Sequence, residues 1–219
     1  MVAPSKEQRR LALVAQRKAS PRLPRHKCLA DFHDGIFECD FVSPWTKSGC
    51  NVDAAVMVIG QDWASADMLE KNPRHVAERG YDDRLATNRR LDDLLRTHLR
   101  LARADCYLTN LFVFIKPGGA SARIPAKDLH WSAQTFTIPE IEIVSPKLVI
   151  CLGLVTFRAL SYVAGQRQPR TMADAVSSPW AYGATMVHCV AHTGAFGTMN
   201  RSKEQVDADW QSLGRVLGK

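Results

Sequence analysis

The chain has 219 residues, of which 46% are apolar and 23% charged, and its formal net charge is +7. This length suits one domain with a substantial core, and this composition excludes a disordered chain and an integral membrane protein. No apolar run reaches the length of a membrane span, and the N-terminal run LALVA is too short for a secretory signal. We therefore expect a folded protein of the cytoplasm.

The positive charge is concentrated at the N-terminus. Residues 1–27 contain eight Lys or Arg and one acidic residue, whereas basic and acidic residues balance in the remaining chain. We interpret residues 1–27 as a basic N-terminal arm and residues 28–219 as a single domain. The charge leaves two roles open for the arm, which either grips nucleic-acid phosphates or serves as a solubilising segment.

Three of the six cysteines lie close together just after the arm. Cys28, Cys39 and Cys50 occur in a region that also contains Pro, Gly, His26 and His33. No pair of them has the two-residue spacing typical of structural zinc, so we predict no metal site there. The other three cysteines lie inside apolar runs, where a thiol behaves as a small buried hydrophobe.

Four short apolar runs rich in β-branched residues predict strands that are buried on both faces. These runs lie at 54–59, 106–114, 147–152 and 185–191. Strands of this kind are typical of a parallel sheet with helices on both sides.

Helices are predicted where apolar residues recur three and four positions apart. These patterns lie at 87–101, 153–162 and 202–219. We expect Thr87 or Asn88 to cap the first helix and Ser202 to cap the last. Strands that alternate with helices predict βαβ units, and hence an α/β fold with a mainly parallel sheet. The Gly- and Pro-containing segment 115–125 is predicted to be a surface loop within the domain.

Polar residues occur at or near the ends of three predicted strands. Gly60, Gln61 and Asp62 follow the first strand, Asn110 lies within the second, and His192 follows the last. In a parallel sheet the ligand crevice lies outside the carboxyl ends of the strands, so these side chains should open toward one side. Taken alone, Asp62 is either an ordinary turn residue or a carboxylate held at a site.

These motifs occur in an order that resembles the uracil-DNA glycosylase superfamily. The order is GQD after a buried strand, an Asn inside the next, SPKLVICLG opening into a helix, and a His after a late strand. The resemblance runs from about Asp53 to Arg201. It implies a three-layer αβα fold with a central four-stranded, mainly parallel sheet.

The resemblance also implies an activity and roles for the motif residues. A monomeric, cofactor-free enzyme would hydrolyse the N-glycosidic bond of deoxyuridine in DNA, releasing free uracil and leaving an abasic site for base-excision repair. Asp62 would serve the sugar and the attacking water, and His192 would stabilise the departing base. Asn110 would read uracil through its amide. Gly60 lets the backbone approach the base, and amides near Gln61 would assist His192.

A base inside a duplex must be extruded before it reaches such a pocket, and this requires further residues. Tyr81 occupies the place of the family's stacking aromatic, with Trp63 as the competing candidate. Phe196 matches the position of an apolar wedge, and simple packing under its loop is the alternative. Four residues are candidates for contacts with DNA phosphates: Ser65, Gly153, Ser178 and Arg201.

The chain departs from the family pattern in three places. Trp63 and Ala64 replace the Pro-Tyr that follows GQD in the best-known branch, so thymine must be excluded by another route or less strictly. Residues 193–195 are Thr-Gly-Ala where that branch has Pro-Ser-Pro, which predicts a more flexible loop. The run 115–150 contains no cysteine, so we predict no iron-sulfur cluster.

Two other functional classes remain for comparison. A binding protein of the same fold would hold uracil or abasic DNA with little turnover. An unrelated α/β hydrolase or nucleotide-binding domain is disfavoured, because the sequence has no G-x-S-x-G, no phosphate-loop lysine motif and no G-x-G-x-x-G.

Overall fold

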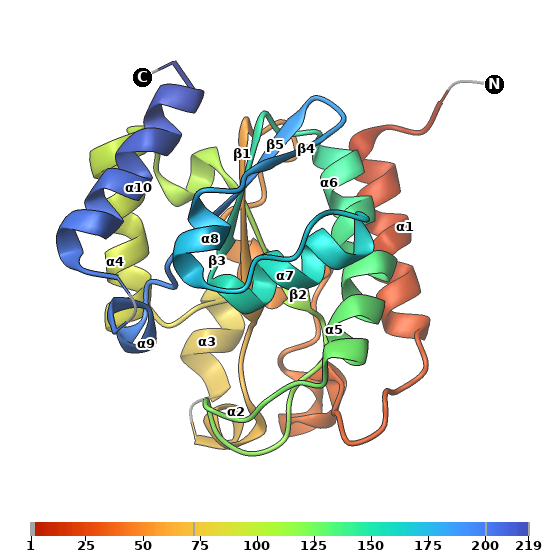
Figure 1. The fold of residues 1–219 in the computed structure, drawn as a ribbon. Coiled ribbons are helices and arrows are strands. Elements are labelled where there is room, and N and C mark those ends of the chain that lie inside the picture. The colour runs from red at the N-terminus through yellow and green to blue at the C-terminus, as the bar shows by residue number, and fades with distance from the viewer. Residues whose placement is uncertain (1–2, 72, 200, 219) are drawn as a thin grey trace.

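The computed structural model describes residues 3–71, 73–199 and 201–218, and their centre is a five-stranded sheet (Figure 1). The strand order is β2-β1-β3-β5-β4. The strands are β1 Val56–Asp62, β2 Tyr107–Phe112, β3 Leu148–Leu152, β4 Trp180–Tyr182 and β5 Thr185–Val190. The pairs β1 with β2, β1 with β3, and β3 with β5 are parallel, which confirms the predicted α/β fold.

The sheet has one strand more than the sequence predicted. The additional strand, β4, pairs antiparallel with β5 and forms the edge of the sheet. It has three residues, and a segment of that length is too short to show the periodicity from which strands are predicted. The four longer strands lie within the four predicted runs, or overlap them at one end.

Alternate residues of β1 face opposite sides of the sheet and join two different hydrophobic cores. Met57 and Ile59 belong to one core, and Val56 and Val58 to the other. The first core contains residues of α1, α5 and α6, and the second contains residues of α4 and α10. Figure 1 shows these two groups of helices on opposite sides of the strands. Burial on both faces explains why the strands read as continuous apolar runs.

The helices connect the strands and cover the two faces. They are α1 Lys6–Ala19, α2 Ala66–Lys71, α3 Pro73–Arg79, α4 Ala86–Leu94, α5 Ala126–Ser132, α6 Ile138–Val144, α7 Leu154–Val163, α8 Met172–Val176, α9 Ala195–Thr198 and α10 Lys203–Val216. Single π-helical turns extend α4 and α5. Within the described ranges, no helix combines the length and the apolar character that crossing a membrane requires.

The predicted helix caps are partly correct. Ser202 caps α10 and, with Gln205, forms a capping box. The prediction for α4 is wrong, because that helix begins after Leu85 without a side-chain cap. Asn88 instead donates its side-chain amide to the backbone oxygen of Asp82 at 2.8 Å, which ties the helix to the preceding loop.

Much of the basic N-terminal segment is a packed helix and does not project as an arm. Leu13 and Val14 of α1 are buried in the same core as α6. Arg17 is also buried, where it pairs with the Glu38 carboxylate and donates to the backbone oxygen of Cys39 at 2.9 Å. The apolar face of the helix explains the packing, and this guanidinium is engaged inside the protein.

Candidate active site

A cavity of about 510 Å³ opens at the carboxyl ends of the parallel strands. It brings together eight of the residues that the sequence singled out: Gly60, Gln61, Asp62, Trp63, Ser65, Tyr81, Asn110 and His192. Its size is in the range of pockets that bind small organic ligands. The prediction that the three strand ends open toward one side is therefore confirmed.

Gly60 and Asn110 are directly opposite each other on β1 and β2. A Cβ atom at Gly60 would lie 2.6 Å from Nδ2 of Asn110, so a side chain at this position would displace the amide. The Asn110 Oδ1 accepts a hydrogen bond from the Ser43 hydroxyl at 2.7 Å, and the Ser43 oxygen accepts one from the Trp45 backbone amide at 3.2 Å. These bonds hold the Asn110 side chain with its Oδ1 facing the Ser43 hydroxyl.

Asp62 is held by contacts to both carboxylate oxygens. The Gln61 side-chain amide donates to Oδ1 at 3.0 Å, and the Lys116 Nζ lies 2.9 Å from Oδ2. The Asp62 side chain is only 12% exposed. Burial raises the pKa of Asp62 above its usual value, although Lys116, His192 and Gln61 each act to lower it. Such a carboxylate beside a cavity can stabilise a cation or accept a proton.

Lys116 is a residue of this site that the sequence analysis missed. The segment after β2 is a loop, as predicted, but Lys116 itself is 4% exposed. Its Nζ also donates to the backbone oxygen of Ala120 at 2.7 Å, and its own backbone oxygen accepts from the amide of Ala66 at 3.0 Å. A lysine beside Pro-Gly-Gly has the pattern of a solvated turn, so only the packing of the loop reveals its position.

His192 presents one ring nitrogen to the cavity because the other is occupied. The backbone amide of Gly194 donates to Nδ1 at 3.0 Å, so in the neutral ring the proton lies on Nε2 and can be donated to a ligand. Surrounding protein lowers the pKa of His192, an effect that Asp62 opposes and Lys116 reinforces. A Cβ atom at Gly197 would lie 1.7 Å from the His192 backbone oxygen, so the loop requires glycine there.

Two aromatic side chains line the cavity in different settings. The Trp63 indole donates its Nε1 hydrogen to the backbone oxygen of Gly80 at 2.7 Å and packs edge-on against Phe37. The Arg103 guanidinium lies 4.2 Å from the centre of the Tyr81 ring and covers one of its faces. Arg103 and the Gly80 carbonyl therefore hold these two rings in place without a ligand.

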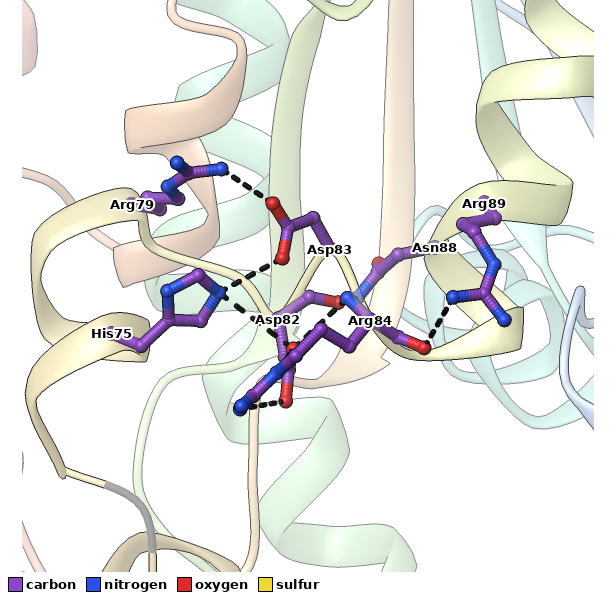
Figure 2. A network of polar contacts seen from close by, with 7 residues as sticks. All are labelled: His75, Arg79, Asp82, Asp83, Arg84, Asn88 and Arg89. Carbon is purple, nitrogen blue, oxygen red and sulfur yellow. Dashed lines mark hydrogen bonds and ion pairs between the residues drawn. The ribbon is translucent and has the colours of Figure 1, made fainter.

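The loop that carries Tyr81 is braced by charged side chains (Figure 2). His75 from α3 lies 2.9 Å from Asp83 and 3.8 Å from Asp82. Arg84 pairs with Asp82 at 2.8 Å, and Arg79 pairs with Asp83. Among the described residues, His75, Asp82 and Asp83 form the group whose spacing would suit a metal ion. Both carboxylates already pair with arginines, and the geometry is that of an ion-pair network.

The residues predicted to contact DNA phosphates are less exposed, or more engaged, than their sequence positions suggested. Ser65 is fully buried, and the Gly153 amide donates to Val190 at 2.8 Å. Ser178 accepts from Arg167 at 3.0 Å. Arg201 makes two bonds of 2.6 Å to the buried Asp209 of α10.

Phe196 lies in α9, but its side chain is outside the described part of the structure. The wedge prediction therefore stays a prediction. Met199, three residues further along, is 78% exposed and is the most exposed large apolar side chain among the described residues. It lies on the same loop, which follows the cavity histidine.

The cysteines at 28, 39 and 50 do not form a cluster with metal-ligand spacing in the described residues. None of the six cysteines, all of which lie in the described ranges, forms a disulfide bond. Cys28 is half-buried, Cys39 is buried and Cys50 is exposed.

Comparison with known proteins agrees with the geometry of the cavity. The sequence profile of the Uracil DNA glycosylase superfamily matches residues 47–214, which is most of the chain and includes β1 to β5. A search of curated protein sequences finds no match. The matched range contains Asp62, Asn110 and His192. The chain is therefore a member of the uracil DNA glycosylase superfamily.

Proposed function

We propose that this protein is a uracil-DNA glycosylase that hydrolyses the N-glycosidic bond of deoxyuridine in DNA and so initiates base-excision repair. One observation carries the proposal: a carboxylate, an amide and a neutral imidazole donor, from three strand ends, line the same cavity. Breaking this bond places positive charge on the sugar and negative charge on the departing base. The carboxylate matches the positive charge on the sugar, and the imidazole donor matches the negative charge on the base. The amide matches the edge of the base.

Asn110 reads the base in this proposal. Its Oδ1 has a second lone pair beyond the one that Ser43 occupies, and this lone pair accepts the N3 hydrogen of uracil. The Nδ2 group donates to the uracil O4. Cytosine presents an acceptor at N3 and a donor at the exocyclic amine, so it faces the amide with the opposite pattern. The Ser43 hydrogen bond supports the orientation of the amide that suits uracil.

Asp62 and His192 act at the bond that breaks. The Asp62 carboxylate faces the sugar, where it stabilises the developing positive charge and orients the attacking water. The His192 Nε2 hydrogen is donated to the uracil O2 as that oxygen gains negative charge. A neutral imidazole suits this role, because its Nδ1 must keep accepting the Gly194 hydrogen bond.

DNA reaches the cavity across a rim rich in basic side chains. The segment 71–90 contains exposed basic residues: Lys71, Arg74, Arg79, Arg84 and Arg89. Lys71 lines the cavity, and positive charge there is the expected footprint of a phosphate backbone. The base is then extruded, and Tyr81 and Trp63 receive it between aromatic surfaces.

The proposal is tested with an oligonucleotide that contains one uracil. Strand scission after alkali is expected with the wild-type protein, and none with the same oligonucleotide containing thymine. Asn110→Ala should reduce the single-turnover rate on uracil by about 10²-fold, because base recognition is lost. Lys147→Ala serves as the control, because this exposed residue directly precedes β3, at the end of the strand opposite to the cavity. Absence of scission with the wild type would overturn the proposal.

A second function has one observation in its favour. Both oxygens of Asp62 are engaged, by Gln61 and by Lys116, which restricts how the carboxylate contacts a water molecule. A protein that holds uracil or abasic DNA with little turnover would tolerate this restriction. Tight binding to abasic DNA, together with negligible release of free uracil, would favour this second function over the enzyme.

A further inference from the structure

Lys116 is a buried, charged residue of this site that has no role in the proposed reaction. Its residue is 4% exposed, and its side chain is 5% exposed. The Nζ atom has two partners, the Asp62 Oδ2 at 2.9 Å and the Ala120 backbone oxygen at 2.7 Å. A buried ammonium group is tolerated only when it is paired and hydrogen-bonded, and the Asp62 carboxylate and the Ala120 carbonyl meet this requirement.

We propose that Lys116 is a positioning residue that keeps the Asp62 carboxylate ionised and fixes its orientation toward the cavity. This inference rests on the proposed glycosylase function for its kinetic consequences. The pairing itself is a property of the protein without DNA.

The backbone places Lys116 beside Asp62 through two attachments. The Lys116 segment forms a bridge with Ser65, and its backbone oxygen accepts from the Ala66 amide. Ser65 lies three residues after Asp62, so the loop that follows β2 is joined to the loop that follows β1. The ammonium group is therefore delivered to the carboxylate by a hydrogen-bonded connection between neighbouring strand ends.

The charges around Asp62 assign the electrostatic role to Lys116. Three groups face the carboxylate: the Lys116 ammonium after β2, the Gln61 amide on β1 and the His192 ring after β5. Gln61 is neutral, and the pKa of His192 is lowered, so the ring carries no charge at neutral pH. Lys116 is thus the cation that offsets the burial of Asp62.

The Lys116 ammonium acts on both Asp62 and His192. Lys116 lowers the pKa of Asp62, and it lowers that of His192 as well. The first effect favours the carboxylate that the cationic sugar requires, and the second favours the neutral imidazole that donates to the base. A neutral side chain at position 116 would weaken both states together.

The pairing is tested first without any reaction. The pKa of the Asp62 carboxyl is measured by carbon-detected NMR titration in the wild type, Lys116→Met, Lys116→Arg and Lys127→Met. Lys127 is an exposed lysine of the neighbouring helix α5 and supplies the matched control. Lys116→Met should raise the Asp62 pKa by about one unit or more, whereas Lys116→Arg and Lys127→Met should leave it close to the wild type.

The kinetic test measures the single-turnover rate of uracil release as a function of pH. In Lys116→Met the acid limb of the profile should move to higher pH and the rate at pH 7 should fall by about 10²-fold. Lys116→Arg should restore most of the rate. A merely structural role would lower the rate without moving the limb, and an unmoved limb would overturn the inference.

Two further outcomes are separated by the design. If Lys116→Met does not fold, Lys116→Gln takes its place, and an unchanged Asp62 pKa in that variant overturns the inference. A covalent protein–DNA product formed with abasic DNA and borohydride, and lost in Lys116→Arg, would instead identify Lys116 as an amine nucleophile. If the wild type has no glycosylase activity, the proposed function fails, while the NMR titration still tests the pairing.

Discussion

Two buried carboxylates lie on opposite faces of the sheet, and their surroundings differ. Asp62 pairs with the Lys116 ammonium and lines the cavity. Glu140 of α6 is 1% exposed, and it accepts hydrogen bonds from the hydroxyls of Tyr107 at 2.7 Å and Thr109 at 2.9 Å. No cation pairs with Glu140 in the described part of the chain. Burial raises its pKa to about 7.

In the proposed function, this difference separates a carboxylate that takes part in the reaction from one that takes part in packing. Both pKa values are raised by burial, so a perturbed pKa alone does not distinguish the two. Asp62 has a paired charge and an opening to a ligand, whereas Glu140 has neutral donors and is enclosed. The strand β2 serves both, because Thr109 faces one side and Asn110 the other.

The largest expected effect comes from removing the negative charge of Asp62, and the same change at Glu140 serves as its comparison. Asp62→Asn should reduce the rate of uracil release by about 10³-fold, because the developing sugar cation loses its counter-charge. Glu140→Gln should leave the rate within about twofold of the wild type. Single-turnover assays on a uracil-containing oligonucleotide measure both. Equal losses in the two variants would remove the distinction between the carboxylates.

The second effect is on stability and comes from Glu140. Its pKa is about 7 in the folded state, above the usual value of 4.5, so the unfolded chain binds fewer protons between these values. The stabilising contribution is complete below pH 4.5 and is lost as the pH rises toward 7, by at most roughly 3 kcal/mol.

Urea unfolding of the wild type and Glu140→Gln at pH 5 and pH 8 measures this contribution. The difference between the two proteins should change with pH in the stated direction. Parallel curves at both pH values would show that Glu140 titrates normally in the folded protein.

A smaller effect is expected from Ser43, which donates a hydrogen bond to the Asn110 amide that we propose reads the base. Ser43→Ala removes the hydrogen bond to the Asn110 Oδ1, which is worth about 1 kcal/mol, and should lower the rate on uracil roughly five- to tenfold. Discrimination against cytosine should decrease as well, since the amide is then free to rotate. Rates on paired uracil and cytosine oligonucleotides measure both changes. Ser212→Ala on α10 is a control that removes a serine hydrogen bond outside the cavity.

The smallest effect is expected at the rim. Arg84 is 60% exposed and pairs with Asp82, and Arg84→Ala should weaken DNA binding by less than about tenfold. The slope of log affinity against log salt concentration should fall by about one, which corresponds to the loss of one phosphate contact. Fluorescence anisotropy at several salt concentrations measures this slope, with Lys147→Ala as the control. An unchanged slope would place the phosphate path elsewhere.

The alternation of strands and helices could be predicted from the sequence, and so could the placement of Asp62, Asn110 and His192 in or just after strands. These features depend on local periodicity and on motif order, which a sequence displays directly. The short strand β4 was missed, because it forms only by pairing with β5 at the sheet edge.

The other residues that line or support the cavity could be identified only from the three-dimensional packing. Lys116 and Ser43 belong to segments that read as turns, and each reaches its partner through a contact distant in sequence. The N-terminal helix α1 likewise packs against the rest of the domain, because Leu13 and Val14 are buried in its core. Burial of a polar side chain depends on what packs over it, and a local sequence pattern does not record that packing.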